Sequence, residues 1–98
     1  MPLFALICHD KPNSLDLRMK NREAHLAYGP STGVKIVLGG PLMSEDGTTM
    51  QGSLLVIEVP DLAAAKKFSA GDPYVKADLF ESVEIRPWRK VIGTAELT

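Results

Sequence analysis

Apolar and polar positions change period several times along the chain, and these changes predict four strands and two helices. We expect strands at residues 3–8, 34–43, 52–59 and 79–88. We expect helices at residues 15–28 and 62–70. The order βαββαβ is typical of an α+β fold, the ferredoxin-like plait, in which two helices cover one face of an antiparallel sheet.

Turn and capping residues indicate where the first helix begins and ends. Residues 9–14 read as a polar turn, and Ser14 is in position to cap the helix that follows. Gly29 and Pro30 are expected to end it, because glycine adopts the left-handed cap and proline does not continue a helix.

Similar signals divide the second half of the chain. The Gly-Gly-Pro sequence at 39–41 indicates a bulge or a close backbone approach in the second strand, and residues 44–51 read as a hairpin loop. Asp61 is expected to cap the second helix and Gly71 to close it. Asp72 precedes a proline, so we expect an extended turn there.

The first helix has a polar stripe where an amphipathic helix normally carries apolar residues. At 100° per residue, one direction holds Arg18, Arg22, His25 and Gly29, opposite the solvent-facing Asp16, Lys20, Glu23 and Ala27. Two interpretations stay open. Either the helix rolls so that the arginines reach the rim and His25 bonds a backbone carbonyl, or a polar pocket lies beneath it. In that pocket the arginines would hold an anion and His25 would do proton or nucleophile chemistry.

Four further residues have both a structural and a functional interpretation. Asp72 either forms a turn or orients the His25 ring, and Asp10, directly after the first strand, either forms a turn or lies at a pocket rim. For Tyr74 and Trp88 we favour packing over a place in the pocket wall.

Length, charge and cysteine content narrow the classes of protein. The 98 residues predict one domain, residues 1–98, and the net charge of −1 predicts neither a nucleic-acid nor a membrane partner. The single cysteine, Cys8, is expected to be a buried apolar residue of a cytoplasmic protein. The spacing of histidines and cysteine predicts no metal site, and no cofactor motif is present.

One face of the predicted sheet has no helix to cover it. Because the first strand is apolar on both sides, we expect a homodimer in which two sheets pack face to face. The tail at 89–98 is expected to be a coil or a short swapped arm.

Several segments at these distances together resemble the YciI-like, or YCII-related, family over about residues 3–92. They are ALICHDK, Arg18 and Arg22 before AHL, LGGP, GSLLVIEV and AGDPYVKADLFESVEIRPWRKV. The resemblance implies a dimeric α/β barrel with His25 and Asp72 as the active-site pair. It also implies a pocket lined by segments that contain Asp10, Arg18, Arg22, Gly40 and Pro41. Asp78 departs from the pattern, because many relatives have glycine there, and the 44–51 loop looks shorter than in some relatives.

The family resemblance does not by itself supply an activity. A few relatives resemble dehydrochlorinases that act on hydroxyhydroquinones. We therefore expect a cofactor-independent lyase or isomerase for a small anionic or phenolic substrate, with His25 as general base or nucleophile and Tyr74 near the substrate. The alternatives are a non-catalytic dimer that binds a small anion for regulation and an accessory domain of another enzyme.

Overall fold

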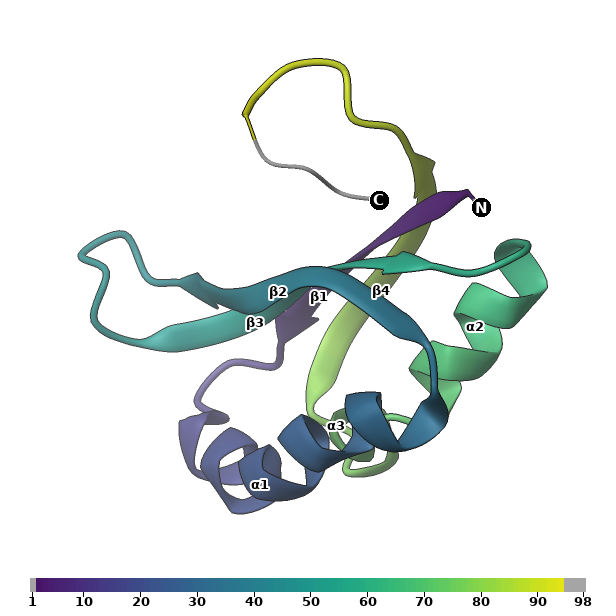
Figure 1. Ribbon diagram of the computed structural model, residues 1–98. Helices are drawn as coiled ribbons and strands as arrows, with labels where there is room; N and C mark the ends of the chain where they lie inside the picture. Colours follow the sequence, from purple (N-terminus) through teal and green to yellow (C-terminus); the bar gives the residue numbers. More distant parts are fainter. Residues whose placement is uncertain (1, 95–98) are drawn as a thin grey trace.

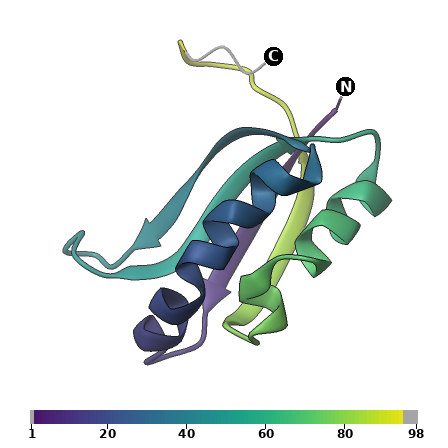
Figure 2. The same cartoon turned by 60° about the horizontal axis from the view of Figure 1, so that its bottom comes forward.

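Seven elements follow one another in the computed structural model, which describes residues 2–94. They are β1 (Leu3–Asp10), α1 (Leu15–Thr32), β2 (Lys35–Met43), β3 (Met50–Glu58), α2 (Leu62–Ala70), α3 (Pro73–Lys76) and β4 (Phe80–Trp88). The strands form one antiparallel sheet in the order β2-β3-β1-β4, and the helices lie on one of its faces (Figures 1 and 2). This confirms the predicted α+β, ferredoxin-like fold, to which the structure adds the short helix α3.

The apolar core lies between the sheet and the helices. Alternate residues of β1 point toward the helices, so Phe4 and Leu6 are buried while the register places Ile57 of β3 beside Phe4. The buried core cluster consists of Phe4, Leu6, Ile57, Val59, Ala65 and Phe68. Tyr28 and Ile36 pack against this cluster from α1 and β2.

The opposite face of the sheet is apolar at its centre and carries the charged side chains of Glu84 and Arg86 on β4, and no helix of residues 2–94 lies over it (Figure 1). Ala5 is paired with Val56, and Val56 with Leu38, so these side chains share that face. Leu38 remains 40% exposed, as does Trp88 beside Leu3. This uncovered face is where the expected second copy would pack.

Helix α1 is longer than predicted, and the expectation that Gly29 and Pro30 end it is wrong. It continues to Thr32, and Gly33 takes the left-handed cap with a φ of 77°. Pro30 has no amide hydrogen for the Leu26 carbonyl, so α1 gives up one backbone hydrogen bond in its last turn and still continues for two residues. The side chain of Thr32 also donates a hydrogen bond to the Gly29 carbonyl in this last turn.

Gly29 instead allows α1 to lie close to β2. A Cβ atom at this position would collide with the Ile36 side chain. At the other end of α1, Ser14 occupies the N-cap position as predicted, but its hydroxyl donates to the Pro12 carbonyl and makes no capping bond.

Of the two alternatives predicted for Gly39, Gly40 and Pro41, the bulge is wrong and the close approach is confirmed. These three residues pair in regular succession with residues 55, 54 and 53 of β3, and the register shifts lie on either side of them, at residues 36–38 and 42–43. Gly39 does provide a close approach, because a Cβ atom there would collide with Leu55.

Where the other element ends differ from prediction, they differ by one or two residues, and both ends of α2 agree. β1 extends through His9 and Asp10, which were assigned to a turn, because both continue the ladder with β4. Asp61 caps α2 as predicted, with its side chain accepting from the Ala64 amide, and Gly71 follows its last residue.

The segment after β4 carries no helix or strand over residues 89–94. The predicted coil or swapped arm also includes residues 95–98, which lie outside the described residues. Among residues 2–94, no helix has the length and apolar character needed to cross a membrane.

Candidate active site

A cavity of about 230 Å³ lies between α1 and the β2–β3 side of the sheet. Its apolar wall includes Leu26, Ile36, Pro41, Met50, Leu55 and Phe68. Its polar wall consists of Arg18, Arg22, His25, Tyr28, Ser53, Asp72 and Tyr74. The polar stripe of α1 therefore faces a pocket, which is the second of the two interpretations left open by the sequence.

His25 and Asp72 meet at the wall of this cavity. The Nδ1 atom of His25 lies 2.8 Å from Oδ1 of Asp72, and both side chains are largely buried, at 15% and 8% exposure. Asp72 is held in place because it is the N-cap of α3 and accepts the Tyr74 amide at 2.9 Å. The turn before Pro73 therefore aims a fixed carboxylate at the imidazole.

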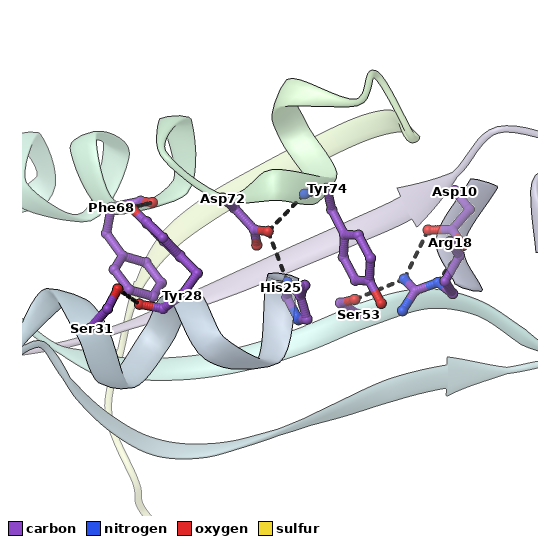
Figure 3. A network of polar contacts seen from close by, with 9 residues as sticks. All are labelled: Asp10, Arg18, His25, Tyr28, Ser31, Ser53, Phe68, Asp72 and Tyr74. Atoms are coloured by element: carbon purple, nitrogen blue, oxygen red, sulfur yellow. Dashed lines mark hydrogen bonds and ion pairs between the residues drawn. The ribbon is translucent and has the colours of Figure 1, made fainter. Parts of the chain in front are cut away.

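The ring of Tyr74 stacks on the ring of His25. Their centroids are 3.9 Å apart and their planes differ by 12°. The guanidinium carbon of Arg18 lies 4.6 Å from the Tyr74 centroid, and Figure 3 shows the Tyr74 ring between His25 and Arg18. Packing from both sides fixes the orientation of the tyrosine and of the histidine.

Arg18 is committed to a buried ion pair with Asp10. Its Nε and Nη2 atoms donate to the two Asp10 carboxylate oxygens at 2.7 and 2.9 Å, and Nη2 also donates to Ser53 Oγ at 2.8 Å. The Arg18 and Asp10 side chains are only 3% and 5% exposed. Burial acts to lower the pKa of Arg18, but the hydrogen bond and charge of Asp10 outweigh it and raise that pKa.

Arg22 is the cation that faces the cavity without such a partner. Its side chain is exposed, and among residues 2–94 it makes no ion pair or hydrogen bond that would neutralise it. It lies one helical turn from both Arg18 and His25. The positive charge available to an anion in the cavity is therefore that of Arg22.

The structure gathers most of the predicted site residues around one space. Gly40 and Pro41 line the cavity with the polar residues, whereas Asp10 lies behind Arg18 and lines a neighbouring groove. Asp78 is outside the cavity wall and forms an ion pair with Lys11 at 2.6 Å. Its φ of 60° is left-handed, a conformation that glycine adopts at little cost, and this fits the glycine expected in relatives.

Two polar residues of the cavity wall were not singled out in the sequence. Ser53 is buried on β3 and receives a hydrogen bond from Arg18. A small polar residue on the helix-facing side of a buried strand was its only local signal. Tyr28 lies on α1 at the cavity wall, and its hydroxyl donates to the Phe68 carbonyl at 2.8 Å. No group of three or more His, Cys, Asp or Glu side chains in residues 2–94 is placed to hold a metal ion.

Comparisons with known proteins agree with this fold. The model of the YCII-related domain matches residues 2–89. Protein YciI of Escherichia coli O6:H1 is 31% identical over 96 residues, which are 91% of this chain and 98% of that protein. A Haemophilus influenzae protein is 33% identical over 97 residues, with 90% and 97% of the two chains covered.

Solved structures extend the comparison to proteins whose names state an activity. The chain is similar to 5-chloro-2-hydroxyhydroquinone dehydrochlorinase (TftG) from Burkholderia phenoliruptrix AC1100, in complex with 2,5-dihydroxybenzoquinone. The TM-score is 0.79 with 36% identity, over 89% of this chain and 93% of the other. An antibiotic biosynthesis monooxygenase, at 11% identity and a TM-score of 0.59 over 94% of this chain and all of the other, shares the fold alone.

Proposed function

The chain belongs to the YCII-related family, and from that premise we propose that it is a small enzyme of lyase or isomerase type. Its substrate is a small anionic or phenolic molecule, and His25 removes a proton from it as general base. The observation that carries this proposal is the 2.8 Å contact between His25 and Asp72 at the wall of the cavity.

The contact with Asp72 determines which nitrogen of His25 can act. Because a carboxylate can only accept, the Nδ1 atom carries the hydrogen in this contact, and in the neutral imidazole Nε2 is then the nitrogen with the lone pair. Asp72 then orients the ring and stabilises the imidazolium that forms when Nε2 takes a proton. A nucleophilic role for Nε2 is the variant of this proposal, and mass spectrometry of protein quenched during turnover detects the covalent adduct it requires.

The cavity favours a single substituted ring as substrate. A cavity of about 150 Å³ holds benzene, so one of about 230 Å³ has room for a ring with a few substituents. The walls are mainly apolar, and Arg22 supplies the charge that pairs with a phenolate or carboxylate oxygen. The similar dehydrochlorinase is named for a substrate of this class.

A turnover assay with 5-chloro-2-hydroxyhydroquinone tests the proposal. We expect the purified protein to consume it and release chloride, and His25→Gln and Asp72→Asn to lower the rate by about 100-fold or more while 2,5-dihydroxybenzoquinone still binds. Glutamine keeps a polar group at position 25 without the base, and asparagine keeps an oxygen to cap α3.

Two outcomes of this assay count against the proposal. Binding of 2,5-dihydroxybenzoquinone without turnover, unchanged in His25→Gln, supports the small-anion regulatory dimer instead. Turnover that survives His25→Gln rejects this residue as the base.

We further propose that two copies pack through the uncovered sheet faces, in the cytoplasm. Leu38 on this face is 40% exposed, and Ala5 and Val56 give it a continuous apolar centre. Sedimentation velocity tests the dimer: Leu38→Lys should yield monomers. Leu62→Lys, at a residue 37% exposed on α2, should leave dimers, and equal effects of the two variants would reject this interface.

A further inference from the structure

We propose that the hydroxyl of Tyr74 is a second catalytic group of this cavity. It donates a proton to a substrate oxygen while His25 removes a proton from carbon. This inference rests on the proposed function and adds the acid that its reaction type requires.

The position of Tyr74 supports this role. The residue lines the cavity, and its ring is parallel to that of His25 within 12° at a centroid distance of 3.9 Å. This stacking places the Tyr74 ring directly beside the ring of the proposed base. Figure 3 shows the phenol oxygen at the end of the ring away from the α3 backbone, on the side of Ser53 and Arg18.

The Tyr74 ring has little freedom to turn away. His25 and Arg18 pack against its faces, and Phe80 meets it edge-on at 5.9 Å. Its backbone amide is bonded to Asp72, the residue that also orients His25. One carboxylate therefore sets the positions of both groups, which is the kind of prior organisation that proton transfer needs.

The proton transfers among the substrate, His25 and Tyr74 balance. In an enolisation, a C–H bond beside a carbonyl breaks and an N–H bond forms at Nε2 of His25. The electron pair moves to the carbonyl oxygen, which gains the proton of the Tyr74 hydroxyl. The imidazolium then returns a proton to the phenolate through water, and no oxidant or reductant takes part. In 5-chloro-2-hydroxyhydroquinone the same transfers run in reverse: the imidazolium protonates the ring carbon that carries chlorine while the neighbouring ring hydroxyl gives its proton to the Tyr74 phenolate. Chloride then leaves that carbon as a second ring hydroxyl loses its proton.

The surroundings of Tyr74 suit an acid at neutral pH. Burial raises its pKa, so that the hydroxyl keeps its proton before the reaction. Arg18 and Arg22 oppose this shift and favour the phenolate. They therefore stabilise the charge that forms when the proton is given away. Arg18, although committed to Asp10, acquires a role through the tyrosine next to it.

Exchange of ring hydrogens in 2-hydroxyhydroquinone, followed by NMR in deuterium oxide without oxygen, tests this role. Tyr74→Phe keeps the stacked ring and removes only the hydroxyl. We expect the exchange rate and the turnover of 5-chloro-2-hydroxyhydroquinone to fall by about 100-fold, with affinity for 2,5-dihydroxybenzoquinone within about threefold of wild type. Tyr28→Phe removes the other phenol, and its pH–rate profile should keep the alkaline limb.

Site-specific replacement of Tyr74 by 3,5-difluorotyrosine separates proton donation from packing. Fluorine makes the phenol more acidic, so the alkaline limb of the pH–rate profile should move to lower pH. An active Tyr74→Phe variant, or an unmoved alkaline limb, overturns the inference and leaves the proposed function standing if His25→Gln is inactive. Wild-type protein that catalyses neither exchange nor turnover rejects both.

Discussion

Arg18 and Asp10 form a bidentate ion pair that joins the first turn of α1 to the end of β1. The guanidinium meets both carboxylate oxygens, at 2.7 and 2.9 Å, with almost no exposure to solvent. The pair holds the helix at a fixed place over the sheet, at one end of the cavity. It also uses Asp10 as the counter-ion of Arg18, so an anionic substrate is left to Arg22.

Breaking this pair should strongly destabilise the fold. Asp10→Asn leaves the Arg18 charge buried without its counter-ion, and we expect a loss of about 3–5 kcal/mol in the free energy of unfolding. Urea denaturation measures it. Glu84→Gln breaks the exposed pair with Arg86 and serves as control, with an expected loss below about 1 kcal/mol. Equal losses would show that burial of the Arg18 pair does not matter.

Removing the charge of Arg22 should affect binding rather than folding. A hydrogen bond to a charged group contributes about 1.5–3 kcal/mol. We therefore expect Arg22→Gln to weaken binding of 2,5-dihydroxybenzoquinone at least tenfold, with stability changed by less than about 0.5 kcal/mol. Calorimetric titration gives the affinity, and Lys20→Gln removes a charge from the opposite side of α1. If Lys20→Gln weakens binding to the same extent, the affinity depends on the net charge of the protein and not on the position of Arg22.

Replacing two glycines of the sheet by alanine should change stability by different amounts. A Cβ atom on Gly52 would collide with the Cys8 carbonyl across the β1–β3 ladder, whereas one on Gly40 meets nothing within 4 Å. A backbone atom cannot move aside as a side chain can, so we expect Gly52→Ala to cost about 1–3 kcal/mol. Gly40→Ala should be nearly neutral in thermal unfolding. A stable Gly52→Ala variant would contradict the tight strand contact.

The thiol of Cys8 should make stability fall at alkaline pH. Burial, reinforced by the charge of Asp72, raises its pKa from 9.0 to about 12. Above pH 9 the unfolded chain loses this proton and the folded chain keeps it. The free energy of unfolding therefore falls by about 1.4 kcal/mol per pH unit up to about pH 12. Cys8→Ala removes this effect.

Urea unfolding at pH 8 and pH 10 measures the difference. We expect the decline between the two pH values to be smaller in Cys8→Ala than in wild type, because lysines and tyrosines titrate alike in both. Parallel declines would show that the folded thiol ionises as readily as the unfolded one.

Residues close in sequence were predicted best. The helical period of 100° per residue placed Arg18 and His25 on one side of α1. The capping residues Asp61 and Gly71 gave the ends of α2. Both features depend on a few neighbouring residues. The end of α1 differs from prediction because proline usually ends a helix, whereas α1 continues through Pro30 to Thr32 and ends at the left-handed Gly33. Helix α3 was missed because its four residues are too few to show a period.

The amino-acid sequence by itself determined the order of the elements, the family and the side of α1 that faces inward, since periodicity and local signals carry that information. Only the tertiary structure decided which charged side chains pair with one another. Asp10 neutralises Arg18, Asp72 meets His25 across 47 positions of the chain, and Arg22 remains open to the cavity. Pairing of this kind depends on distances between elements, which form only when the helices pack on the sheet.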